Sequence, residues 1–196
     1  MSVLNDMKKI ERRSDIPSFL ARHGLNRRLC EVGVRFGFNL QALASTKPEL
    51  LIGVDHYRVT DDPGQQDTGM SQNKLDGIYK VVFERFMLDP SVKIFRGQSN
   101  IIAKVFPLFF FDYVYIDADH TEEGAYADMC SWWPRVRQGG ILAGHDYIDA
   151  DSRVGTEFGV INAVKRFLKD LKIPVEFLHS TKEGYCSWMI MRIDGE

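Results

Sequence analysis

The sequence lacks the features of several common classes of protein. It contains no apolar run near the roughly 18 residues that a membrane-spanning helix needs, so no membrane partner is expected. Its cysteines, Cys30, Cys130 and Cys186, are widely spaced and odd in number, which favours free thiols in a reducing compartment over a disulfide framework. The charged segment 1–15 has no apolar stretch typical of a secretory signal. Together these absences favour a cytoplasmic protein.

An excess of positive charge is missing as well. The chain has 25 Lys and Arg against 27 Asp and Glu, a net charge of −2, whereas nucleic-acid-binding proteins usually carry a basic surface. We interpret Arg12–Arg13 and Arg27–Arg28 as solvated surface and expect no nucleic acid as a partner. A chain of 196 residues without internal repeats usually forms one domain. We predict a single domain over 1–196, with an N-terminal helical segment over 1–28 and a core over 29–196.

What the sequence does contain is an alternation of short apolar strands and amphipathic helices. The pattern predicts strands over 28–34, 49–55, 91–97, 111–117, 139–147, 174–180 and 185–194, and helices over 14–24, 38–47, 71–88, 100–106, 121–136 and 157–172. Such alternation is typical of an α/β fold with helices on both faces of a mostly parallel sheet. We therefore predict a Rossmann-like, doubly wound, seven-stranded sheet whose last strand runs antiparallel.

Polar side chains follow five of the predicted strands, at the edge where ligands bind in open α/β sheets. Each has an ordinary explanation as a turn or helix cap, and Asn39 is predicted to cap the helix after the first strand. Five such ends on one edge nevertheless indicate a ligand site. The residues are Glu31, Gly33 and Gly37 after the first strand, Asp55 after the second, Gln98 and Ser99 after the third, Asp117, Asp119 and His120 after the fourth, and His145 and Asp146 after the fifth.

The turn after the first strand limits which cofactor fits. Gly33 and Gly37 permit a tight turn and a close approach of the backbone. The dinucleotide fingerprint GxGxxG is absent, because Arg35 stands where its second glycine belongs. Asp55 follows the neighbouring strand, where an acidic residue can bind both hydroxyls of a ribose. A nucleoside without a pyrophosphate fits this pattern better than a nicotinamide dinucleotide.

The motifs EVGVRFG, DADH and GGILAGHDY resemble those of class I S-adenosylmethionine-dependent methyltransferases. Within that class they are similar to small bacterial O-methyltransferases related to the catechol, caffeoyl-CoA and macrolide or sugar enzymes. The resemblance extends from Leu29 to the C-terminus. It implies that S-adenosylmethionine is the cofactor and that the methyl group passes to a hydroxyl of a small molecule.

The resemblance also implies roles for single residues. Glu31, Gly33 and Gly37 would hold the methionine part of the cofactor, Asp55 its ribose, and Gln98 and Ser99 its adenine. Asp117 would lie near the cofactor's amino group and, with His145 and Asp146, would bind a divalent metal. His120 stands where the metal-dependent relatives carry a catalytic lysine. An imidazole ligand would favour Mn²⁺, Fe²⁺ or Zn²⁺ over Mg²⁺.

Histidine suits a general base near neutral pH, so His120 is predicted to take the proton of the acceptor hydroxyl, with His145 as the second candidate. Three alternatives stay open: a metal-free site, a cofactor-binding scaffold without catalysis, and a nicotinamide-dependent oxidoreductase. The segments 56–70 and 148–156 are polar and are predicted to cover the site. They favour a sugar-like or natural-product acceptor. Trp132 and Trp133 are predicted to pack the helix over 121–136 rather than to cradle a substrate, and a homo-oligomer is possible.

Overall fold

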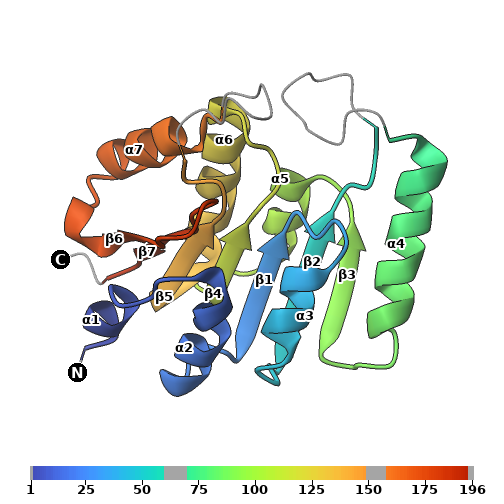
Figure 1. The fold of residues 1–196 in the computed structure, drawn as a ribbon, viewed down its shortest axis with the longest axis horizontal. Helices are drawn as coiled ribbons and strands as arrows, with labels where there is room; N and C mark the ends of the chain where they lie inside the picture. Colours follow the sequence, from blue (N-terminus) through green and yellow to red (C-terminus); the bar gives the residue numbers. More distant parts are fainter. Residues whose placement is uncertain (1, 60–69, 149–157, 194–196) are drawn as a thin grey trace.

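The computed structural model describes residues 2–59, 70–148 and 158–193, and a seven-stranded sheet forms its centre (Figure 1). The strands are β1 (Arg28–Val32), β2 (Leu50–Asp55), β3 (Val92–Arg96), β4 (Phe111–Ile116), β5 (Val136–Gly144), β6 (Leu178–Ser180) and β7 (Trp188–Met191). Their order is β3-β2-β1-β4-β5-β7-β6. The first five strands are parallel, and β7 runs antiparallel to both β5 and β6. The predicted fold class is therefore confirmed, including the antiparallel last strand.

Helices cover both faces of the sheet (Figure 1). One face carries α1 (Val3–Met7), the 3₁₀ turn η1 (Arg13–Asp15), α2 (Ile16–Arg22), α3 (Phe38–Ala44) and α4 (Gln72–Phe86). The other carries α5 (Ser99–Ile102), η2 (Ala103–Val105), α6 (Glu122–Trp132), η3 (Trp133–Arg135) and α7 (Val160–Asp170). A last 3₁₀ turn, η4 (Val175–Phe177), precedes β6. No helix in the described ranges is both long and apolar enough to span a membrane.

Alternating side chains of the central strands pack into two separate cores. Cys30 and Ile52 belong to the core under α6 and α7, whereas Leu29 and Leu51 belong to the core under α2 and α3. This alternation follows from the two-residue period of a strand. Every residue of β4 is buried, as expected for a central strand covered on both faces. The charged residues that follow β4 are thereby held at a rigid edge.

The tryptophans pack as predicted. Trp132 is fully buried, and Trp133 contacts Phe167 of α7 edge to face, with ring centroids 5.6 Å apart. The prediction for Asn39 is wrong. Helix α3 begins at Phe38, and Gly37, which has a positive φ of 73°, is its N-cap residue. Asn39 lies in the first turn, and its amide donates a hydrogen bond to Glu31.

Candidate active site

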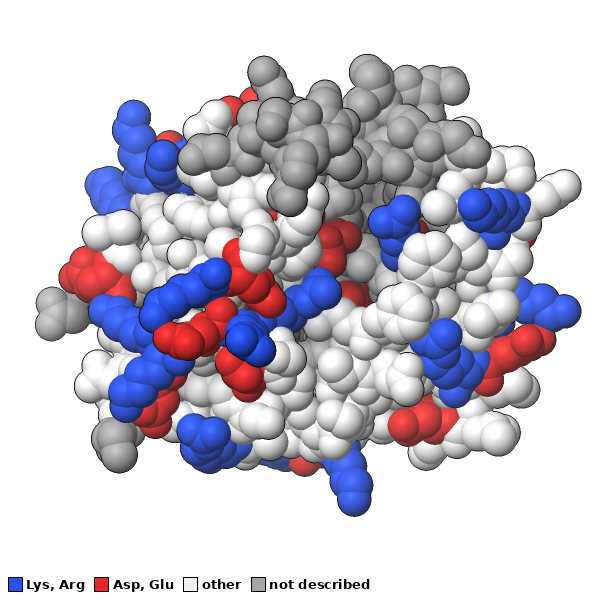
Figure 2. Space-filling view, viewed as in Figure 1, with Lys and Arg blue, Asp and Glu red and all other residues white. Residues whose placement is uncertain are grey.

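A cavity of about 1140 Å³ opens at the carboxyl ends of the parallel strands. The space-filling view shows the molecule hollowed near the middle of this face, with acidic side chains inside the hollow (Figure 2). All but one of the residues predicted to form the site line this cavity: Glu31, Gly33, Asp55, Gln98, Ser99, Asp117, Asp119, His120, His145 and Asp146. Gly37 is not among the lining residues and acts instead as the cap of α3. The fold thus brings the polar strand ends together around one space.

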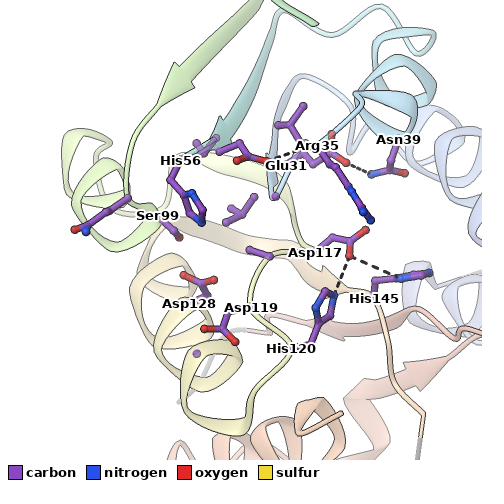
Figure 3. A pocket seen from close by; sticks show the side chains of 18 of the residues that line it. Glu31, Arg35, Asn39, His56, Ser99, Asp117, Asp119, His120, Asp128 and His145 are labelled. Carbon is purple, nitrogen blue, oxygen red and sulfur yellow. Dashed lines mark hydrogen bonds and ion pairs between the residues drawn. The ribbon is translucent and has the colours of Figure 1, made fainter. Parts of the chain in front are cut away.

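Glu31 is a buried acid at the end of β1, with 2% of its surface exposed (Figure 3). One carboxyl oxygen, Oε1, accepts a hydrogen bond of 3.0 Å from the Asn39 amide. The other, Oε2, is buried and has no hydrogen-bond partner among the described residues. Burial is the main reason why the pKa of Glu31 lies well above its ordinary value. A cationic group entering the cavity would satisfy this oxygen and favour its ionised form.

The turn after β1 is held tightly against the neighbouring strands. Gly33 has a φ of 87°, and a Cβ atom there would lie 1.9 Å from the Asp117 carbonyl oxygen. Its N–H donates to the Val54 carbonyl at 2.8 Å. The next turn residue, Arg35, also has a positive φ of 46°, and its N–H donates to Asp55 Oδ2 at 2.9 Å. The ends of β1, β2 and β4 therefore share one compact junction that only glycine permits at position 33.

Asp55 lies at the predicted position after β2, and its carboxylate also holds the backbone of two neighbouring turns. Its Oδ2 accepts the Arg35 N–H, and its Oδ1 accepts the Tyr57 N–H at 2.8 Å. Each carboxylate oxygen can accept a second hydrogen bond, and Asp55 lines the cavity. The turn explanation considered from the sequence is thus correct, and the role of Asp55 toward a ribose stays a prediction.

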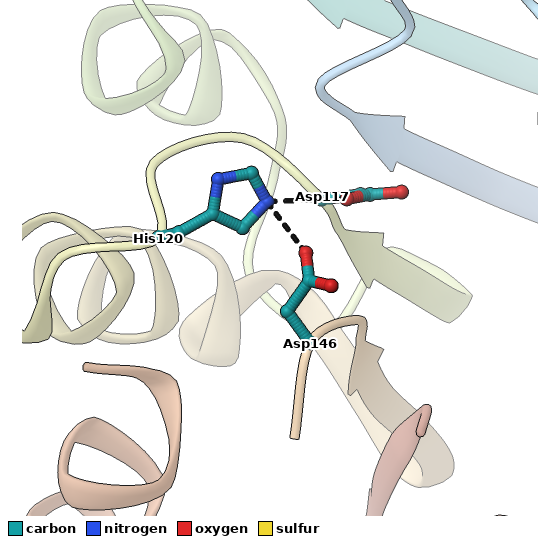
Figure 4. A group of neighbouring side chains, drawn as sticks. All are labelled: Asp117, His120 and Asp146. Carbon is teal, nitrogen blue, oxygen red and sulfur yellow. Dashed lines mark ion pairs between the residues drawn. The ribbon is translucent and has the colours of Figure 1, made fainter. Parts of the chain in front are cut away.

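The fourth and fifth strand ends form a cluster of two carboxylates and two imidazoles (Figures 3 and 4). His120 Nε2 lies 2.6 Å from Asp146 Oδ2 and 3.6 Å from Asp117 Oδ1. His145 Nδ1 lies 3.1 Å from Asp146 Oδ1 and 3.8 Å from Asp117 Oδ1. Asp146 has a positive φ of 54°, a conformation that is uncommon outside glycine and concentrated at functional sites. Both acids therefore contact both histidines.

These contacts decide the charge of His120. Burial favours the neutral imidazole, but the hydrogen bonds and charges of Asp117 and Asp146 outweigh it and raise the pKa of His120 to about 10. In the same way, His120 and His145 outweigh the effect of burial on Asp146 and lower its pKa. At neutral pH the pair is therefore an imidazolium and a carboxylate. The His120 Nδ1 atom, on the other side of the ring, is buried and has no partner in the described part of the chain.

The cluster has the donors of a metal site. Asp117, His120 and Asp146 can each offer one ligand atom, and these atoms all lie within 4.8 Å of one another (Figure 4). The set implied by the resemblance contained His145 in place of His120. The structure groups His120 with the two acids and leaves His145 beside them. The resemblance assigned the two histidines by their positions in the motifs, whereas which imidazole lies closest to both acids depends on how the ends of β4 and β5 fold together.

Several residues of the cavity were missed by the sequence analysis. Phe158 lies edge-on to His120 at 5.6 Å, and Tyr185 stacks against His145 at 6.3 Å. Asp128, in the middle of α6, is only 7% exposed, and burial is the main cause that raises its pKa to about 6. Its one sequence signal was an acid among the apolar residues of α6. The two aromatic residues gave no comparable signal, because they reach the site through tertiary packing.

Arg13 corrects the interpretation of the basic N-terminal cluster. It lines the cavity, and its Nη1 lies 3.7 Å from Asp117 Oδ2. Its backbone N–H donates to Glu183 Oε1 at 2.6 Å, which ties η1 to the segment before β7. Arg27, in contrast, is exposed and pairs with Glu49, as a solvated surface residue does. The N-terminal segment thus contributes a cation to the site.

The two segments predicted to cover the site lie mostly outside the described residues. Within 56–70, His56 and Val59 line the cavity, and 60–69 are not described. Within 148–156, only Ile148 is described. Their covering role stays a prediction.

The strand order and the position of the cavity define the fold of class I S-adenosylmethionine-dependent methyltransferases. Residues 30–147 match the family described as "Methyltransferase domain", and the chain belongs to this family. No curated protein is similar enough in sequence to match the chain.

Solved structures show the same fold at low sequence identity. The O-methyltransferase from Bacillus cereus, in complex with SAH, has a TM-score of 0.63 and 15% identity over 93% of this chain and 80% of its own. TomG from Streptomyces achromogenes, an O-methyltransferase involved in tomaymycin synthesis and solved with SAM, has a TM-score of 0.60 and 15% identity, with the same coverage of 93% and 80%. A putative rRNA-methylase from Clostridium thermocellum has a TM-score of 0.64 and 11% identity over 93% and 98%. Membership in the family favours a methyltransferase over the oxidoreductase considered from the sequence.

Proposed function

We propose that the protein transfers the methyl group of S-adenosylmethionine to a hydroxyl oxygen of a small molecule. The observation that carries this proposal is the single cavity that connects Glu31 and Asp55 with the cluster of Asp117, His120 and Asp146. A cofactor held at the first pair of acids would have its methyl group near the second group of residues. The O-methyltransferases among the similar structures support the choice of oxygen.

Residues along the cavity suit the successive parts of the cofactor, from its methionine part to its adenine. The buried Oε2 of Glu31 suits the α-ammonium group of the methionine part, because an ammonium would provide its missing donor. Asp55, which follows the neighbouring strand and lines the cavity, suits the ribose hydroxyls. The α5 and α6 side, with Gln98 and Asp128, is then left for the adenine. Asp117, between Glu31 and His120 in Figure 3, lies at the boundary between cofactor and acceptor.

Methyl transfer from a sulfonium is an in-line displacement, so holding the acceptor oxygen in place supplies much of the catalysis. The acceptor must also lose a proton, and we propose His120 for that step. As an imidazolium between Asp117 and Asp146, His120 cannot accept a proton. The role therefore requires that the charge of the two acids be neutralised when the ligands are bound. His145, in contact with both acids, is the second candidate base.

A divalent cation fits the same residues. Asp117, His120 and Asp146 would hold it through two carboxylate oxygens and one imidazole nitrogen, a donor set that suits Mn²⁺, Fe²⁺ or Zn²⁺ better than Mg²⁺. When bound, the cation would lower the pKa of a hydroxyl brought to it. His120 would then serve as a ligand through Nε2, and His145 would be the imidazole left to take the acceptor's proton.

The test is methyl transfer from labelled S-adenosylmethionine to a panel of sugars, phenols and hydroxylated natural products, with EDTA or with added Mn²⁺. We expect turnover on a hydroxyl compound. A His120→Ala variant is expected to keep its affinity for S-adenosylhomocysteine and to lose a factor of roughly 10²–10⁴ in kcat. His145→Ala is the matched variant, and with EDTA present, where His120 holds no cation, the larger loss identifies the base. Unchanged kcat in the His120 variant removes that residue from the mechanism. Absence of S-adenosylhomocysteine binding by the wild-type protein removes the proposed function itself.

A further inference from the structure

Arg13 brings a positive charge to the end of the cavity where the two histidines lie. It lines the cavity, and its Nη1 atom is 3.7 Å from Asp117 Oδ2. The other oxygen of Asp117, Oδ1, lies 3.6 Å from His120 Nε2 and 3.8 Å from His145 Nδ1. One carboxylate thus contacts the guanidinium with one oxygen and both candidate bases with the other. A small molecule with a hydroxyl at either histidine can therefore reach Arg13 with a second group.

The position of Arg13 is fixed by contacts between two distant parts of the chain. Its backbone N–H donates to Glu183 Oε1 at 2.6 Å. Two residues earlier, the Glu11 carbonyl accepts the Lys182 backbone N–H at 2.9 Å, and Glu11 Oε1 accepts from Lys182 Nζ at 2.6 Å. The segment before η1 is thereby tied to the connection between β6 and β7. A guanidinium held on such a support is positioned before a ligand binds, which favours affinity.

The guanidinium itself is within reach of a ligand. The side chain of Arg13 is 40% exposed, and it carries five N–H donors in a planar fork that matches the two oxygens of a carboxylate. Its charge is present at every physiological pH. The ordinary explanation is that Arg13 only balances the charge of Asp117. A guanidinium with that role alone would be expected at about 2.7–2.9 Å, whereas the distance here exceeds that of a direct hydrogen bond.

We propose that Arg13 binds a carboxylate of the methyl acceptor, so that the substrate is a hydroxy acid and not a neutral hydroxyl compound. The inference rests on the proposed function, since it requires an acceptor hydroxyl at His120 or His145. A carboxylate suits the site better than a phosphate, because a dianion near Asp117 meets more repulsion than one guanidinium offsets. Tyr185 lines the cavity and stacks against His145 at 6.3 Å, so a flat ring between the two groups of the acceptor would find an aromatic surface.

The test uses pairs of compounds that differ in one charge: the isomeric hydroxybenzoates with the corresponding hydroxybenzamides, and glucuronate with glucuronamide. Calorimetry on the protein saturated with S-adenosylhomocysteine measures their binding, and label transfer from S-adenosylmethionine measures kcat/KM. In the wild type we expect an acid to exceed its amide by about tenfold or more in both measurements. In Arg13→Gln the acid should lose about that factor while the amide does not, so that the ratio approaches one. Arg12→Gln is the matched control and should leave the ratio unchanged, because Arg12 is exposed and is not among the residues that line the cavity.

The affinity for S-adenosylhomocysteine separates the possible outcomes. Arg13→Gln should keep it within a fewfold of the wild type; an equal loss for this ligand and for the acids assigns Arg13 to the carboxylate of the cofactor and overturns the inference. If the wild type binds S-adenosylhomocysteine but binds no acid more tightly than its amide, Arg13 only pairs with Asp117 and the inference fails alone. If Arg13→Gln does not fold, Arg13→Lys decides, since it keeps the charge without the fork: a reduced ratio supports the inference and an unchanged ratio overturns it. If the wild type does not bind S-adenosylhomocysteine, the proposed function and the inference both fail.

Discussion

Replacing Gly33 with alanine should disrupt both the stability of the protein and its cofactor site. The added Cβ would lie 1.9 Å from the Asp117 carbonyl oxygen and 2.4 Å from its carbonyl carbon. Both atoms belong to the backbone at the end of β4, where they cannot turn aside as a flexible side chain can. The junction between β1 and β4 must therefore open by about 1 Å to restore an ordinary contact.

The size of the effect has two parts. An alanine with a φ of 87° is strained by roughly 1–2 kcal/mol, and forcing an atom into a packed junction costs roughly another 1–3 kcal/mol. Gly37→Ala separates the two parts, because Gly37 has a similar φ of 73° but its Cβ would meet no atom closer than 3.4 Å. We expect losses in unfolding free energy of roughly 2–5 kcal/mol for Gly33→Ala and roughly 1–2 kcal/mol for Gly37→Ala.

Denaturation in urea measures these losses, and calorimetry with S-adenosylhomocysteine measures the site. Gly33→Ala should abolish detectable binding of S-adenosylhomocysteine, because opening the junction moves Glu31 away from Asp117. Gly37→Ala should bind within a fewfold of the wild type, because Gly37 does not line the cavity. Equal losses of stability in the two variants, or normal binding by Gly33→Ala, would refute the account of a junction closed by backbone contact.

Three further predictions concern the charged groups. The His120 pKa is raised from 6.5 to about 10, so its stabilising contribution should be complete below pH 6.5 and lost as the pH rises to 10; the difference in unfolding free energy between wild type and His120→Gln should shrink over that range. The lowered pKa of Asp146 gives stability that is present above its ordinary value of 3.8 and lost below it; Asp146→Asn should therefore flatten the acid limb of the same stability profile. Glu31→Gln should weaken the binding of S-adenosylhomocysteine by roughly tenfold or more in calorimetry, because a neutral amide replaces the carboxylate that accepts from the ligand's ammonium group.

The edge of the sheet that holds the site could be predicted because its signals are local. An apolar strand followed directly by Asp55, or by Asp117 and His120, combines a strand with a polar end in a few residues. Parallel strands then bring such ends together without any knowledge of packing. The position of Asn39 was less predictable, since capping is a local rule, whereas its contact with Glu31 depends on how α3 packs beside β1.

Residues that enter the cavity through tertiary packing could not be predicted in this way. Arg13 reaches Asp117 because η1 is tied to Glu183 near the other end of the chain. Phe158 and Tyr185 lie beside the histidines for the same kind of reason. Each of them has an ordinary local sequence, and a basic pair such as Arg12–Arg13 is usually solvated. Only the long-range contacts show that Arg13, and not Arg12, faces the site.

The protonation of His120 could not be predicted from the sequence either, because it depends on carboxylates that folding brings close to the ring. An isolated histidine suits a general base near neutral pH, but folding places Asp146 at 2.6 Å and Asp117 at 3.6 Å from the same Nε2 atom. A proton and a divalent cation must then compete for one position, because both are stabilised by the same two carboxylates. Cation affinity should accordingly rise with pH as the proton is lost more easily. Loss of the proton from His120 therefore determines both the ligand set of the cation and which histidine acts as the base.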